Sequence, residues 1–232
     1  MRPRLLVSVR SVDEALLAAR EGADFIDLKE PGRGALGDLP VETTAAIVGA
    51  LRAQGAAQPI SATIGDVPMR ELATIAERVE AIGAAGVDIV KVGVDAADPA
   101  AASVLSWLAG CGRTIVPVFI ADGGIDVVMV RAAARLGFAA LMVDTADKQA
   151  GSLLDLYDDA QLRTFVETVH EEGREAGLAG ALRREQAARL VAIGPDFAGF
   201  RSAVCDGDRR GTLDPARLRA LRDALETAAL SR

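Results

Sequence analysis

The chain has little histidine and cysteine, and each scarcity removes a class of function. His170 is the one histidine among 232 residues. A catalytic triad built on histidine and a metal site with several histidine ligands are therefore effectively excluded. Cys111 and Cys205 lie far apart and match no spacing typical of a metal or redox site. We therefore expect no metal site, and we expect a location in the reducing cytoplasm.

Long hydrophobic runs and a basic surface are also missing. No apolar stretch approaches the roughly 20 residues that span a bilayer, and the apolar segment near the start is too short for a signal peptide. The net charge of −7 leaves no basic stripe to neutralise nucleic-acid phosphates. We expect neither a membrane nor a nucleic acid as partner. A small anionic ligand and a homo-oligomer stay open, because local groups decide both.

The chain instead repeats one strand-and-helix unit along its whole length. Strand-like β-branched runs occur at 5–9, 23–29, 59–65, 88–93, 114–121, 139–145, 177–181 and 196–202. Helix-like segments lie at 12–21, 41–54, 69–85, 125–136, 162–172, 184–192 and 215–230. Glycines such as Gly22, Gly86 and Gly137 end helices just before the next strand, since glycine readily adopts the left-handed conformation of a helix end.

Strict alternation of strands and helices predicts parallel strands with crossover helices. Eight such units, with no linker or low-complexity tract, predict an α/β fold: a single (β/α)₈ barrel domain over 1–232. An open, doubly wound sheet is the alternative. It is disfavoured because no Gly-x-Gly-x-x-Gly turn follows the first strand.

Side-chain alternation predicts which residues face the barrel interior. At 23–29, Ile26 and Leu28 should pack under helices, which turns Asp27 and Lys29 inward near the end of the strand. Barrel enzymes react at the carboxyl ends of their strands, so inward polar groups there should converge on one site. The same alternation turns Ser61, Thr63, Lys91, Asp144 and Arg201 inward, and Lys148 follows Asp144 by four residues in the next loop.

Lysine is scarce: the 26 lysine and arginine positions hold three lysines, Lys29, Lys91 and Lys148, each at or just beyond a strand end. Arginine cannot replace lysine where the amine itself must react, because the guanidinium stays protonated. A neutral lysine amine can attack a carbonyl to form a Schiff base, and neighbouring Asp27 and Asp144 could then move protons. The alternative is that these lysines only bind phosphate or pair with the aspartates.

Three loops complete the expected site. The glycine-rich segment 30–38 either closes over a substrate or is a simple connection. Residues 180–181 and 201–202 follow the seventh and eighth strands, where barrels commonly bind phosphate. The candidate substrate- and phosphate-binding residues are therefore Ser61, Thr63, Gly180, Arg201 and Ser202.

With these residues in view, the chain resembles the (5-formylfuran-3-yl)methyl phosphate synthase family, also called 4-(hydroxymethyl)-2-furancarboxaldehyde-phosphate synthases. The clearest pieces are Gly-Ala-Asp-Phe-Ile-Asp-Leu-Lys at 22–29 and Ser-Ala-Thr-Ile-Gly-Asp-Val-Pro at 61–68. Further pieces lie in order at 5–8, 34–37, 90–93, 143–146, 148, 178–180 and 199–205. The resemblance thus extends over essentially the whole chain, and it departs from the family pattern just after Cys205.

The resemblance implies a class I aldolase-like barrel that joins two molecules of glyceraldehyde 3-phosphate into a phosphorylated furan aldehyde, with loss of phosphate and water. The product would feed the biosynthesis of methanofuran-type one-carbon carriers. The substrate would be a phosphorylated triose, and no metal or organic cofactor is implied. By motif, Lys29 would form the Schiff base, Lys91 would transfer protons, and Asp27, Asp144 and Lys148 would assist.

Two other functions fit the residues. One is another Schiff-base aldolase or transaldolase that acts on sugar phosphates. The other is a non-catalytic barrel that binds a phosphorylated metabolite, which would need only the charge of Lys91 and not its amine.

Overall fold

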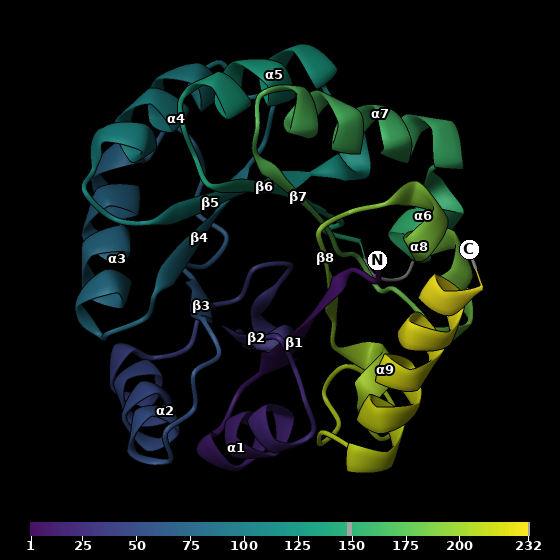
Figure 1. Cartoon of the computed structure of the whole chain (residues 1–232). Coiled ribbons are helices and arrows are strands. Elements are labelled where there is room, and N and C mark those ends of the chain that lie inside the picture. The colour runs from purple at the N-terminus through teal and green to yellow at the C-terminus, as the bar shows by residue number, and fades with distance from the viewer. Residues whose placement is uncertain (148–149, 232) are drawn as a thin grey trace.

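The computed structural model describes residues 1–147 and 150–231, in which eight parallel strands form a closed barrel (Figure 1). Closure is direct, because β1 and β8 pair in parallel from Arg4 opposite Phe197 to Val7 opposite Phe200. The (β/α)₈ prediction is therefore confirmed and the open sheet is excluded. The strands are β1 Arg4–Val9, β2 Phe25–Leu28, β3 Ile60–Thr63, β4 Ile89–Val94, β5 Ile115–Ile120, β6 Ala140–Asp144, β7 Glu175–Leu178 and β8 Phe197–Phe200.

Helices surround the barrel and follow the strands in order (Figure 1). Short polar side chains start several of them by accepting free backbone N–H groups, as Ser11 does for α1 and Asp214 for α9. The helices are α1 Val12–Arg20, α2 Val41–Ala53, α3 Leu72–Ala84, α4 Ala101–Gly110, α5 Val127–Arg135, α6 Leu153–Leu156, α7 Asp159–Glu171, α8 Ala187–Ile193 and α9 Pro215–Leu230.

Two helices were not expected from the sequence. Helix α4 buries Ala101, Val104, Leu105 and Leu108, which is the spacing of one helix face, although small residues weaken the pattern between them. Helix α6 is a single turn in the loop after β6. The remaining helices lie within a few residues of the predicted ranges, and α9 matches its range at both ends.

The apolar core has two layers, as side-chain alternation predicts. Ile26, Leu28, Val90 and Val92 pack outward under the helices. A smaller cluster fills the inside of the barrel, where the rings of Phe25 and Phe197 lie 5.7 Å apart at the amino ends of β2 and β8. Because apolar side chains fill the amino end of the barrel interior, the inward polar groups lie at its carboxyl end. The other members of the inner cluster are Leu6, Ala35, Leu36, Val116, Val118, Ala140, Met142 and Ala179.

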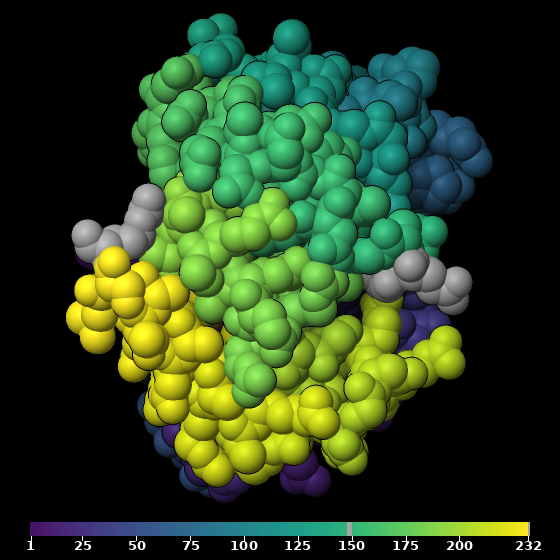
Figure 2. All heavy atoms as spheres, turned by 90° about the vertical axis from the view of Figure 1, so that its right-hand side faces the viewer, coloured from purple at the N-terminus to yellow at the C-terminus, as the bar shows by residue number. Residues whose placement is uncertain are grey.

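The C-terminal helix closes the ring of helices, because α9 packs against both α8 and α1. Figure 2 shows this face, where the yellow C-terminal segment lies directly against the green segments that precede it. In the described part of the chain, no helix combines the length and the apolarity that crossing a membrane requires.

The inner cluster predicts the effect of a single methyl group. A Cβ at Gly177 of β7 would overlap the Phe197 ring, whereas nothing lies near a Cβ built at Gly49 in the exposed middle of α2. We expect Gly177→Ala to lower the free energy of unfolding by about 1–3 kcal/mol, because an added methyl strains a packed interior. Gly49→Ala should raise it by about 0.5–1 kcal/mol. Urea unfolding of both variants tests this, and a Gly177→Ala protein as stable as the parent would contradict the packing described.

Candidate active site

One cavity opens at the carboxyl ends of the strands and contains most of the predicted polar residues. Its lining residues lie on β1, β2, β4, β6, β7 and β8 or in the loops that follow these strands. Among the described residues, none from β3 or β5 lines it. The lining residues are Leu6, Ser8, Asp27, Lys29, Pro31, Lys91, Met142, Asp144, Ala179, Gly180, Ala181, Gly199, Phe200, Arg201, Ser202 and Arg209. Four of the five predicted catalytic residues thus meet here, and the fifth, Lys148, lies outside the described residues.

Asp27 is the hydrogen-bonding centre of this cavity. The strand register sets Ser8, Asp27 and Ser61 side by side on β1, β2 and β3. Both hydroxyls donate to the Asp27 carboxylate, over 2.9 Å from Ser8 and 2.6 Å from Ser61. The Lys91 amine donates to the same carboxylate over 2.9 Å from β4. Four neighbouring strands therefore hold one buried carboxylate and one lysine in a fixed arrangement.

The charge state of Asp27 follows from these neighbours. Burial alone would raise its pKa, but the positive charges of Lys91 and Lys29, with the hydrogen bonds from Ser61 and Lys91, outweigh burial and lower the pKa. Asp27 is thus an anion at neutral pH, and its oxygens are already engaged. It is suited to orient Lys91 and to balance its charge.

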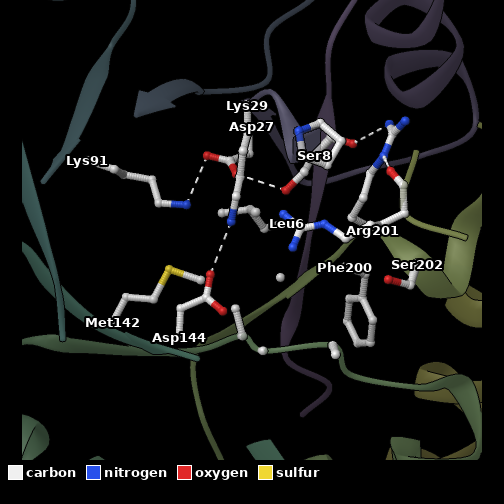
Figure 3. A pocket seen from close by; sticks show the side chains of 16 residues that line it. Leu6, Ser8, Asp27, Lys29, Lys91, Met142, Asp144, Phe200, Arg201 and Ser202 are labelled. Atoms are coloured by element: carbon white, nitrogen blue, oxygen red, sulfur yellow. Dashed lines mark hydrogen bonds and ion pairs between the residues drawn. The ribbon is translucent and has the colours of Figure 1, made fainter. Parts of the chain in front are cut away.

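Lys29 forms a second pair on the same cavity. Its Nζ atom lies 3.2 Å from Oδ2 of Asp144, the last residue of β6, whose Oδ1 accepts the N–H of Thr145. Figure 3 shows the two lysine side chains pointing toward the middle of the cavity, Lys29 to Asp144 and Lys91 to Asp27. The Lys29 side chain is 10% exposed and that of Lys91 is 4% exposed. Lys29 is therefore the more accessible amine.

Ser61 and Thr63 do not line the cavity, although both are buried as the alternation predicts. Ser61 serves Asp27, and Thr63 donates to the carbonyl oxygen of Gly37. The reason is that the loop at 30–38 folds over this side of the barrel and buries Leu36 in the inner cluster.

The carboxylate of Asp66, in the loop after β3, holds the segment 30–38 in place. Asp66 accepts the N–H groups of Ala35 and Leu36. Gly34 has a φ of +113°, and a Cβ there would collide with the Asp66 carboxylate, so the close contact requires glycine. The glycine-rich loop is thus a packed wall of the site in this structure.

Of the five predicted substrate- and phosphate-binding residues, Gly180, Arg201 and Ser202 line the cavity, but the Arg201 guanidinium is bonded elsewhere. Gly180 and Ser202 lie at the rim of the cavity. The Arg201 guanidinium forms a nearly buried ion pair with Glu14 of α1, with a shortest distance of 2.6 Å. Its remaining bonds go to backbone carbonyl oxygens.

Sequence reasoning missed Ser8, Glu14 and Arg209. Ser8 is the one polar residue between Leu5 and Val9, so the alternation applied to the other strands would have identified it. Glu14 lies on a helix and Arg209 in an irregular loop, and neither position shows a periodic signal. Within residues 1–147 and 150–231, no group of three His, Cys, Asp or Glu side chains is placed to hold a metal ion.

Comparison with known proteins decides the family. The model of the 4-HFC-P synthase family matches residues 5–222. The chain belongs to the 4-HFC-P synthase family. It is therefore an enzyme, and its two lysine–carboxylate pairs lie where a barrel enzyme has its active site.

Full-length relatives agree with this membership. A protein of Methylorubrum extorquens is 43% identical over 227 residues, which cover 94% of this chain and 89% of the relative. The (5-formylfuran-3-yl)methyl phosphate synthase of Methanosarcina acetivorans is 34% identical, with 89% and 92% covered. That of Methanopyrus kandleri is 36% identical, with 97% and 100% covered.

Solved structures support the fold of this synthase family member. A phosphoribosyl anthranilate isomerase from Thermus thermophilus superposes with a TM-score of 0.66 at 20% identity, covering 97% of this chain and 98% of that one. A 3-hexulose-6-phosphate synthase gives 0.62 at 20% identity, with 97% and 100% covered.

The buried Asp27 carboxylate predicts an acid-sensitive stability. Asn at this position would leave Lys91 buried without its counter-charge, so Asp27→Asn should lower the free energy of unfolding at pH 7 by roughly 3–5 kcal/mol. Because the folded pKa of Asp27 lies below its unfolded value of 3.8, its contribution is present above that pH and is lost as the pH falls through the folded pKa. The loss of stability on acidification should therefore be shallower in the variant.

Urea unfolding between pH 7 and pH 3 measures both effects. Asp13→Asn in the exposed first turn of α1 is the matched control and should keep the pH dependence of the parent. If Asp27→Asn had the stability of the parent across this range, Asp27 would not be the stabilising carboxylate described.

Proposed function

We propose that this enzyme condenses two molecules of glyceraldehyde 3-phosphate into (5-formylfuran-3-yl)methyl phosphate, with loss of phosphate and water, through a Schiff base on Lys29. The observation that carries the proposal is the presence of two lysines, each with its own carboxylate, on one cavity. The names of the full-length relatives supply the product, and a phosphorylated triose as substrate is part of the proposal. The place of this product in methanofuran-type cofactor biosynthesis belongs to the same proposal.

Lys29 suits the covalent step. It extends just beyond β2 into the cavity, and its bond to Asp144 is the longer of the two lysine–carboxylate bonds. Asp144 is placed to take a proton from the amine, whose lone pair then attacks the carbonyl carbon of the triose. Loss of water from the adduct gives an imine, and the imine acidifies the neighbouring C–H bond. Elimination of phosphate and formation of a carbon–carbon bond both start from that carbon.

Lys91 suits proton transfer. It lies deeper in the cavity, and the carboxylate that it contacts is itself held by Ser8 and Ser61. A proton donor held on another side of the cavity from the Schiff base can serve the dehydration steps, which need an acid and a base at different positions. Arginine in its place would keep the charge and lose the proton transfer.

Borohydride trapping tests the covalent step. With glyceraldehyde 3-phosphate and borohydride, we expect a reduced adduct on Lys29, and peptide mapping is simple because the chain has three lysines. Lys29→Arg should abolish the adduct and lower turnover by more than about 10³-fold, as loss of a covalent nucleophile does. Formation of a furan is followed by its near-ultraviolet absorbance.

Lys91→Arg is the matched variant, because it makes the same substitution at the other described lysine. It should still form the adduct on Lys29 while losing turnover. An adduct mapped to Lys91 or Lys148, or full turnover by Lys29→Arg, would refute the assignment of Lys29. A trapped adduct without furan absorbance would instead identify another Schiff-base aldolase or a transaldolase.

A further inference from the structure

Arg201 has no N–H group left for a substrate. A guanidinium has five N–H donors. In Arg201, Nε donates to the carbonyl oxygen of Arg209, Nη1 donates to the carbonyl oxygen of Ser8 and to Glu14, and Nη2 donates to Glu14 and to the carbonyl oxygen of Gly211. Binding an anion would mean breaking a nearly buried ion pair. Arg201 is thus a positioning residue.

What Arg201 positions is the loop after β8. Two of its bonds hold backbone carbonyls of this loop, at Arg209 and Gly211. The loop is closed at its base, where Cys205 and Leu213 form an isolated antiparallel bridge. The backbone of Arg209 is therefore fixed at the rim of the cavity, and its side chain is the part free to reach inward.

The Arg209 side chain lies beside the catalytic groups. It lines the cavity that contains Lys29 and Asp144, and also a second, outer hollow with Gly34 and Ala146. Its Nη2 atom donates to the carbonyl oxygen of Gly34 over 2.9 Å, which joins the loop after β8 to the loop at 30–38. Among the described residues the guanidinium donates no other hydrogen bond, so its remaining N–H groups are available to an oxyanion.

 Arg209 is an incompletely balanced cation. Within residues 1–147 and 150–231, no carboxylate lies within ion-pair distance of its guanidinium. Burial lowers the pKa of Arg209, and the nearby Asp144 carboxylate acts in the opposite direction. A half-buried cation that has no carboxylate in ion-pair contact favours an anionic ligand.

The turn at 180–181 lines the same cavity as Arg209, and its backbone conformation is unusual. Gly180 and Ala181 both have positive φ angles, of 113° and 46°, and Ala181 is the one non-glycine residue with a positive φ in the described part of the chain. A side-chain-bearing residue is held in this conformation only at a cost in free energy, which functional sites often carry. Turns of this kind present backbone N–H groups to anions. Ser202 adds a hydroxyl on the same cavity.

We propose that Arg209 binds the phosphate group of the substrate, facing the turn at 180–181 and Ser202, and thereby selects phosphorylated over unphosphorylated trioses. The inference rests on the proposed function for its phosphorylated substrate. A guanidinium binds phosphate through paired N–H groups, which a lysine amine cannot reproduce. Arg201 acts on this contact only by fixing the loop.

Titration with inorganic phosphate, followed by calorimetry, tests Arg209 without any turnover. We expect Arg209→Ala to weaken phosphate binding by about 10- to 100-fold, as loss of a charge-assisted contact does, and Arg209→Lys to recover part of it. Arg20→Ala, an exposed arginine at the far end of α1, is the matched control and should bind phosphate as the parent does. Equal binding by parent and Arg209→Ala, or no binding by the parent, overturns the inference.

Trapping with two aldehydes separates this inference from the proposed Schiff base. Arg209→Ala should slow borohydride trapping of glyceraldehyde 3-phosphate about 10- to 100-fold and leave trapping of unphosphorylated glyceraldehyde unchanged. A loss of trapping with both aldehydes would show a structural role and overturn the inference. If the parent traps neither aldehyde, the Schiff-base proposal fails, and the phosphate titration still decides the role of Arg209.

Discussion

The site depends on the pairing of the buried Asp27 carboxylate with Lys91. A buried charge is costly unless it is balanced and hydrogen-bonded, and Asp27 receives two hydroxyl bonds and one lysine bond. Each partner comes from a different strand, so the contact forms only when β1 to β4 have their observed register. A shift of one strand by one residue would turn these side chains toward the helices. The chemistry and the closure of the barrel are thus linked.

A second constraint divides the barrel mouth into a filled and an open half. Leu36 packs in the inner cluster with Val116 and Val118 of β5, and Asp66 accepts backbone N–H groups of the loop that carries Leu36. The open half keeps Lys29, Lys91 and the ends of β6 to β8 in contact with the cavity. The bond from Arg209 to Gly34 joins the loops on the two sides. This bond connects the wall of the site to its rim.

Local patterns predicted much of this arrangement, and long-range contacts account for the rest. Alternation within single strands was enough to place Asp27, Lys29 and Lys91 inward, because each strand has one face to the core. It could not predict that the loop with Leu36 would cover Thr63, or that Glu14 would occupy Arg201 across 187 residues of chain. Arg209 lies in an irregular loop whose direction is set by those same contacts. The fold was thus more predictable than the individual roles in the site.

The two lysine–carboxylate pairs explain how one cavity can divide its chemistry. An amine must leave its carboxylate before it attacks a carbonyl, and that step costs less where the bond is longer and the side chain is more exposed. Lys29, 3.2 Å from Asp144, meets both conditions better than Lys91, 2.9 Å from a carboxylate that two serines hold. Firm anchoring suits a group that must deliver protons repeatedly at one position. The different environments of two identical side chains thus support the proposed covalent role of Lys29 and the proposed proton-transfer role of Lys91.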